Sequence, residues 1–124
     1  MTNIEVRSGW IVDSIAINGT IGGKVGESTG GSSNQFNLMF GEQIVHTRAD
    51  RVRYQGMICL GRLYFKTSSG RECGPFGSAP ARNCPITGNI NLSVNTIRDL
   101  KFVTTRNSKY LHDIKVRNNH GGHM

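Results

Sequence analysis

Trp10 and Asp13 are the residues whose types and spacing in this sequence suggest binding chemistry, because they stand close together just after a Ser8-Gly9 pair. A carboxylate accepts hydrogen bonds from hydroxyl groups, and an indole ring offers a flat apolar face. A neutral polyol such as a sugar ring needs both, so the pair predicts a small polyol-binding site. Two simpler roles stay open. Asp13 can cap the turn or pair with Arg7, and Trp10 can cover the edge of the core.

The elements around this pair read as strands and turns. Residues 4–17 alternate apolar and polar side chains, so we expect two strands joined by a tight turn at Ser8-Gly9, where a glycine can take positive φ without steric cost. Residues 19–33 contain two Gly-Gly pairs and little that can be buried, so we expect a loop there. Its glycines would let backbone N–H groups approach a ligand. A phosphate-binding glycine loop is disfavoured, because no helical pattern follows.

Short apolar runs separated by turn residues continue along the whole chain. Further strands are expected at residues 35–40, 42–47, 52–54, 57–67, 72–78, 90–94, 100–103 and 110–116. Pro75 between glycines indicates an edge or bulged strand. Helical spacing is never sustained for three turns, and residues 93–102 come nearest to it. The pattern therefore predicts an all-β protein, as a sandwich, barrel or prism.

Three segments share one pattern, in which a turn and an apolar residue precede an alternating strand. They are residues 9–17 (GWIVDSIAI), 56–65 (GMICLGRLYF) and 108–116 (SKYLHDIKV). Their starts lie about fifty residues apart, which indicates three similar sheet units arranged around an axis.

The bulk composition limits the domain number and the partners. The 124 residues predict a single domain over 1–124, with 118–124 as a flexible tail. No apolar run is long enough to cross a membrane, and no signal peptide is visible, so we expect a soluble protein, either cytoplasmic or secreted. The net charge of +7 favours anionic partners, but no run of five like charges occurs, and a solvated surface explains the charge equally well.

The reactive side chains form no familiar catalytic or metal-binding motif. Cys59 lies in an apolar run and is expected to be buried, while Cys73 and Cys84 can either form a bridge or stay free. The four histidines do not form a convincing metal set. No nucleophile elbow, HExxH or P-loop is present, and the eight acids do not pair suggestively, so we expect neither an enzyme nor a cofactor.

The chain resembles the jacalin-related lectins over nearly its whole length. The segments that carry the resemblance are IEVRSGWIVDSIAI, FNLMFGEQI, RLYFKTSSGRECGPFGS and LKFVTTRNSKYLHDIKV, in the family's order. The VRSG turn at residues 6–9 is especially similar to griffithsin-type lectins. The resemblance implies a β-prism I fold, with three Greek-key sheets around a pseudo-threefold axis.

The resemblance also implies which residues bind a sugar. In this family the sugar lies between a Gly-x-x-x-Asp turn and a glycine-rich loop, where the Asp accepts from hydroxyls and main-chain amides donate to them. The matching turn residues are Gly9, Trp10, Ile11 and Asp13, and the matching loop residues are Gly30, Gly31 and Ser32. The other two copies depart from the pattern.

In the third copy Ser108 and His112 replace the Gly and the Asp, and the middle copy has Leu60 or Gly61 at the Asp position. At most one conventional site is therefore expected. The family's N-terminal glycine-rich strand has no counterpart in the given sequence, so we expect a partner protomer, the C-terminal residues or a rearranged edge to take its place.

These observations lead to three alternative functions. The first is a lectin for mannose-type or related neutral hexose glycans. The second is a prism that binds sulfated or phosphorylated glycans through basic surface residues. The third is an assembly domain whose sugar sites have decayed. The expected partners are glycans or glycoproteins and, as an option, further copies of the chain, but not nucleic acid.

Overall fold

A computed structural model describes residues 2–18, 20–26, 31–78 and 84–117. In these parts of the chain, the regular elements are ten strands and one short 3₁₀ turn. They are β1 (Thr2–Ser8), β2 (Val12–Ile17), β3 (Thr20–Gly26), β4 (Ser32–Leu38), β5 (Ile44–Tyr54), β6 (Met57–Thr67), β7 (Glu72–Phe76), β8 (Ile86–Ser93), η1 (Ile97–Asp99), β9 (Leu100–Thr104) and β10 (Leu111–Val116). The described residues contain no helix long and apolar enough to span a membrane.

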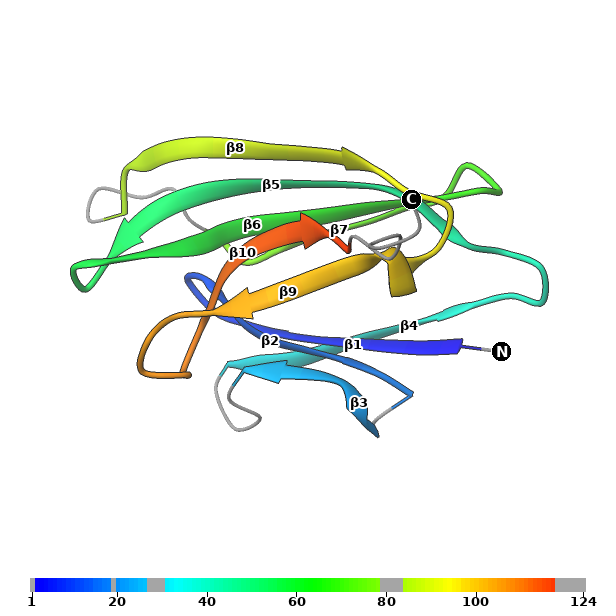
Figure 1. Ribbon diagram of the computed structural model, residues 1–124, viewed down its shortest axis with the longest axis horizontal. Helices are drawn as coiled ribbons and strands as arrows, with labels where there is room; N and C mark the ends of the chain where they lie inside the picture. The colour runs from blue at the N-terminus through cyan, green and yellow to red at the C-terminus, as the bar shows by residue number, and fades with distance from the viewer. Residues whose placement is uncertain (1, 19, 27–30, 79–83, 118–124) are drawn as a thin grey trace, which may run out of the picture.

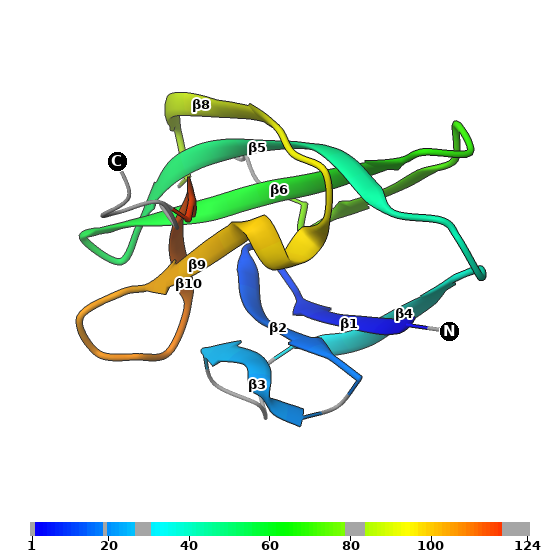
Figure 2. The same cartoon turned by 45° about the vertical axis from the view of Figure 1, so that its right-hand side comes forward.

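The strands form three sheets, as the sequence predicts. Their orders are β3-β2-β1-β4, β7-β6-β5-β8 and β10-β9, and every paired neighbour is antiparallel. Both four-stranded sheets have the strand order of a Greek key. In Figures 1 and 2 the β9–β10 ribbon lies between these two sheets. The all-β prism is therefore confirmed, with two strands in the third sheet of the described chain.

One apolar core is shared by all three sheets. The alternation in β6 turns Leu63 and Phe65 inward, as expected from the period of a strand. Phe65 lies 6.1 Å from Phe36 and 6.3 Å from Phe76 between ring centroids. Apolar side chains of β1, β2, β9 and β10 join the same cluster. The three sheets are thus held by burial against one another.

Several sequence-based expectations need correction. Residues 19–33 were expected to form a loop, but they contain β3 and the start of β4. β3 pairs with β2 at the edge of its sheet, and backbone pairing of this kind needs no large apolar side chains. The expected strands at 42–47 and 52–54 are one strand, β5, whose register shifts between Asp50 and Arg51. Residues 93–102, which come nearest to helical spacing, contain the last residue of β8, the short η1 and part of β9.

The remaining boundaries follow the turn residues. The strand expected at 57–67 is β6 itself, and β7 is an edge strand with an irregular register.

All three cysteines are free thiols. Cys84 packs with Cys59 in a second, smaller cluster, whereas Cys73 packs against the main core. The alternative of a Cys73–Cys84 bridge is therefore wrong.

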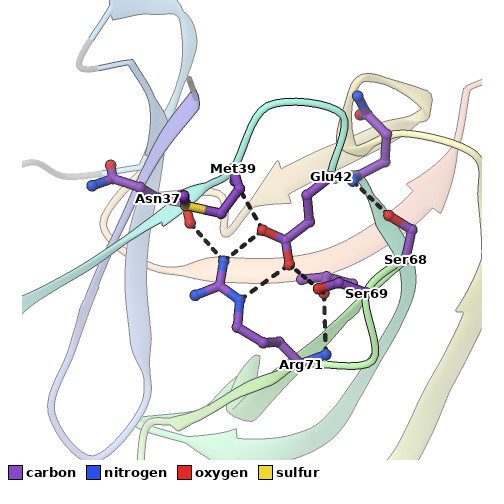
Figure 3. Close-up of polar contacts among 8 residues, drawn as sticks. Asn37, Met39, Glu42, Ser68, Ser69 and Arg71 are labelled. Carbon is purple, nitrogen blue, oxygen red and sulfur yellow. Dashed lines mark hydrogen bonds and ion pairs between the residues drawn. The ribbon is translucent and has the colours of Figure 1, made fainter.

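A buried carboxylate fixes the turn between β4 and β5 (Figure 3). Glu42 is 6% exposed and accepts hydrogen bonds from Arg71 Nε at 3.1 Å and Nη2 at 2.8 Å. It also accepts from the backbone N–H of Met39 at 2.8 Å and from Ser69 Oγ. The Arg71 guanidinium donates in turn to the Asn37 carbonyl at 2.6 Å. This network joins the first sheet to the β6–β7 turn of the second.

The Glu42 network predicts a specific dependence of stability on pH. The hydrogen bond from Arg71, with those from Ser69, Thr67 and Met39, holds the pKa of Glu42 well below its usual range. A depressed pKa contributes stability above the unfolded-state value of about 4.3, and this contribution is lost as pH falls from there toward the folded-state value. Glu42→Gln is expected to lower the melting temperature at pH 7 by several degrees. It should also flatten the fall in melting temperature between pH 5 and pH 2, measured by circular dichroism.

Glu72→Gln, at an exposed position of β7, is the matched control and should melt like the wild type at every pH. Equal pH dependence in wild type and Glu42→Gln would show that the network does not govern acid stability.

Candidate functional site

The β1–β2 connection is a tight turn whose backbone is held from two directions. The N–H of Gly9 donates to the carbonyl of Ile11 at 2.9 Å. From the end of β7, the N–H of Ser78 lies 3.2 Å from the carbonyls of both Gly9 and Trp10. Gly9 does not have positive φ, and a Cβ built on it meets no atom within 4 Å. The expected reason for a glycine at this turn is therefore wrong, since neither its conformation nor its surroundings require one.

A glycine near this turn that the fold does require is Gly31, which lies directly against Asp13. Gly31 has φ of +64°, a conformation that favours glycine. A Cβ on it would collide with Oδ2 of Asp13 and would lie 2.6 Å from the carbonyl oxygen of Ser8. The backbone at Gly31 thus forms one side of the space around the carboxylate. The structure brings together the turn and the glycine-rich segment, two regions that the sequence places eighteen residues apart.

A cavity of about 310 Å³ opens beside this contact. Its lining includes four predicted residues of the turn and one of the loop: Gly9, Trp10, Ile11, Asp13 and Gly31. Ser32 is exposed at the start of β4, paired with Ser8, and does not line the cavity. Gly30 lies outside the described residues.

Three residues of this cavity were not predicted from the sequence: Tyr54, Lys109 and Tyr110. Tyr54 ends β5, and the other two belong to the β9–β10 loop. The rings of Tyr54 and Tyr110 meet edge to face with centroids 5.5 Å apart. The repeated segments contain a signal for Lys109 and Tyr110, because three similar units around an axis bring their turns to one end of the prism. Tyr54 lies outside the repeated segments, at the end of β5.

The side chains of the cavity divide into a buried acceptor and an exposed aromatic rim. Asp13 is 7% exposed on β2, whereas the Trp10 side chain is 58% exposed. Burial raises the pKa of Tyr54, with smaller contributions from Tyr110, Cys84 and Asp13. Burial, with Cys84 and Asp13, also raises the pKa of Cys59 to about 11, so this thiol stays protonated near neutral pH. The arrangement can bind hydroxyl groups and an apolar ring face, and it offers no activated thiol.

Metal binding gains no support from the described residues, where no three His, Cys, Asp or Glu side chains gather closely enough to hold an ion. His120 and His123 lie outside the described range.

The comparisons with known proteins agree with this fold. The family profile of the jacalin-like lectin domain matches residues 1–116. A Malaysian banana lectin structure is 26% identical with a TM-score of 0.60, and the match covers 81% of this chain and 67% of that one. An artocarpin–mannotriose complex is 17% identical with a TM-score of 0.66, covering 94% and 80%. Frutalin from Artocarpus incisa in complex with galactose is 14% identical with a TM-score of 0.62, covering 94% and 90%. No curated protein sequence matches significantly.

The contact between Gly31 and Asp13 predicts different tolerance at two glycines of the site. Gly31→Ala combines an unfavourable φ with a collision and is expected to lower the free energy of unfolding by about 2–4 kcal/mol. Gly9→Ala, in open space, should change it by less than about 0.5 kcal/mol. Urea unfolding of both variants measures the difference. Equal stability of the two variants would mean that the backbone at Gly31 does not pack against the Asp13 carboxylate.

Proposed function

The chain belongs to the jacalin-like lectin domain family, and from this premise we propose that it binds carbohydrate, holding a neutral hexose of the mannose type in the Asp13 cavity. The lectin structures similar to this chain include complexes with mannotriose and with galactose. They support carbohydrate as the ligand class. The preference for mannose is inferred from the match of the turn and loop residues to the family pattern.

The observation that carries the proposal is the position of Gly31 over the carboxylate of Asp13. A carboxylate at the floor of a cavity accepts hydrogen bonds from neighbouring sugar hydroxyls, and such charge-assisted bonds are about twice as strong as neutral ones. Because Asp13 is nearly buried, water competes weakly for its oxygens. The Trp10 indole at the rim offers an apolar surface for the C–H face of a ring.

The size of the cavity favours one sugar residue. About 310 Å³ lies at the lower end of the usual range for ligand pockets, about 300–1,000 Å³. A terminal hexose fits this space better than an internal segment of a long chain. Ile11 is 2% exposed, lines the cavity and packs in the small cluster with Cys59. Gly30 and Ser32 complete the proposed loop on either side of Gly31.

We also propose that the protein binds sugar without cleaving it. Glycoside hydrolysis in most families uses two carboxylates on opposite sides of the scissile bond. Among the described residues that line the cavity, Asp13 is the one acid. One carboxylate supplies an acceptor but not the acid–base pair.

A second candidate ligand class for this cavity is an acidic glycan, and Lys109 is the observation that favours it. Lys109 lines the cavity, and its ammonium group can donate to a sulfate or carboxylate substituent on a bound sugar. Ionic strength separates the two ligand classes, because a contact between exposed charges is screened over about 10 Å at 0.1 M salt, whereas binding of a neutral hexose is not.

Self-association belongs to the proposal because a single site cannot crosslink glycans. In the described part of the chain, β9 and β10 pair only with each other, so each has an edge with unpaired backbone groups that can accept another strand. A dimer mass in static light scattering at micromolar concentration is the expected result, and a strictly monomeric mass would remove self-association from the proposal.

Asp13→Asn tests the carbohydrate site. The amide keeps the shape but loses the charge, so the dissociation constant for methyl α-mannoside should rise about 10- to 100-fold in calorimetry. Glu72→Gln is the control and should bind like the wild type. A glycan array at low and at high salt accompanies the titration. The signal for neutral mannosides is expected to be the same at both salt concentrations. Wild-type affinity in a folded Asp13→Asn protein would rule out this cavity as the site.

A further inference from the structure

A second cavity, of about 280 Å³, lies at the same end of the prism as the Asp13 cavity. Part of its lining is the β5–β6 turn with Met57 and Ile58, and another part is Thr104 at the end of β9 with Thr105 and Arg106 of the β9–β10 loop. His112 of β10 completes the lining. In Figure 1 the β5–β6 turn and the β9–β10 loop lie together at the left end of the molecule. We call this space the Arg106–His112 cavity.

The β9–β10 loop separates the two cavities. Its first residues line the Arg106–His112 cavity, while Lys109 and Tyr110 line the Asp13 cavity. The two cavities share no lining residue, so a ligand can occupy either one independently.

The charges of the second cavity differ from those of the first. Its ionisable lining residues are Arg106 and His112, and no carboxylate lines it in the part of the chain that the structure describes. The Arg106 side chain is exposed, and none of the described residues accepts a hydrogen bond from its guanidinium. A guanidinium in this position is available for a planar anion such as a carboxylate or a sulfate ester.

His112 stands where the first repeat has Asp13. Each is the second residue of its strand, β10 and β2, and each follows a buried apolar residue, Leu111 and Val12. His112 therefore occupies, in the third unit, the place that provides the acceptor in the first.

The hydrogen bond of His112 determines what its ring can do. Nδ1 lies 2.7 Å from the carbonyl oxygen of Ile58. Because a carbonyl only accepts, Nδ1 carries the proton, and Nε2 of the neutral ring is an acceptor. The replacement of Asp by His thus keeps an acceptor for a hydroxyl while removing a negative charge that would repel an anionic ligand.

We propose that the Arg106–His112 cavity is a second binding site, which takes a sugar residue carrying an anionic substituent, either a sulfate ester or a carboxylate. Arg106 pairs with the anionic group, and Nε2 of His112 accepts from a ring hydroxyl. The net charge of +7 assists the approach of acidic glycans from solution. This site does not depend on the function proposed for Asp13. With both cavities at one end, a partly sulfated glycan can present a neutral residue to one and an acidic residue to the other.

The test is a titration of the full chain, followed by backbone NMR, with galactose 6-sulfate, glucuronic acid, galactose and inorganic sulfate as separate probes. The two acidic sugars separate the sulfate source from the carboxylate source. The expected result is that at least one acidic sugar shifts the amide signals of Ile58 and His112 and binds about fivefold or more tightly than galactose. Raising the salt concentration should weaken this binding.

Variants of the two lining residues identify the groups. Arg106→Gln should lower the affinity for the acidic sugar about fivefold. Arg98→Gln removes the same charge from η1, outside the cavity, and should change the affinity less than twofold. His112→Asp puts a negative charge opposite Arg106 and should abolish binding of the acidic sugar, with thermal melting to verify the fold.

Three results would overturn the proposal. One is equal affinity for galactose and for both acidic sugars. Another is inorganic sulfate binding as tightly as the sulfated sugar, which would leave the hydroxyl contact without a role. The third is loss of acidic-sugar binding in Asp13→Asn, which would locate the ligand in the other cavity. The expected result is that Asp13→Asn no longer binds methyl α-mannoside but still binds the acidic sugar. This pair of measurements distinguishes failure of this proposal from failure of the Asp13 site.

Discussion

Burial of the inner face of the β9–β10 ribbon is the constraint on which both cavities depend. A ribbon of two strands is marginal in water on its own. Here Phe102, Leu111 and Ile114 enter the core shared with β1 and β6. Burial of a side chain of this size contributes about 1.5–3 kcal/mol, so the ribbon is held by the core rather than by strand neighbours. Each cavity takes part of its lining from this ribbon or its loop, and the packing that stabilises the fold therefore also positions the residues that line both cavities.

The repeated architecture explains how one scaffold can present two different chemistries. Strands β2 and β10 each place their second residue beside a cavity, directly after a buried apolar residue. In β2 this residue is a carboxylate with a glycine backbone against it, and in β10 it is an imidazole that donates to a neighbouring carbonyl. Substitution at one repeated position changes the charge of a cavity without changing the core beneath it.

The sequence predicted the elements that local rules determine and missed those that depend on packing between sheets. Leu63, Phe65 and Thr67 alternate clearly, so the strand at 57–67 was predicted with its correct bounds. The glycine-rich β3 has no such alternation, and its pairing with β2 depends on the backbone alone. Gly9 shows the limit of turn rules, because a glycine in a turn need not have positive φ.

The same distinction applies to the candidate site. Asp13 and the glycine segment were predicted together from the family resemblance, and the structure places Gly31 against the carboxylate. Tyr54 and Tyr110 come from different sheets, and their edge-to-face contact follows from the way in which two sheets pack, which no local pattern in the sequence encodes.

The Glu42 network at the far end of β4 is connected to the site through strand register. β1 and β4 pair without a bulge from Thr2 opposite Leu38 to Ser8 opposite Ser32. A slip of one residue would reverse the faces of every side chain in β4 and move Gly31 away from Asp13. The inward Phe36 and Leu38 oppose such a slip, and Arg71 holds the Asn37 carbonyl while it pairs with Glu42. Glu42, at one end of β4, thus helps to maintain the register of this strand. At the other end, the same register brings Gly31 to the carboxylate of Asp13.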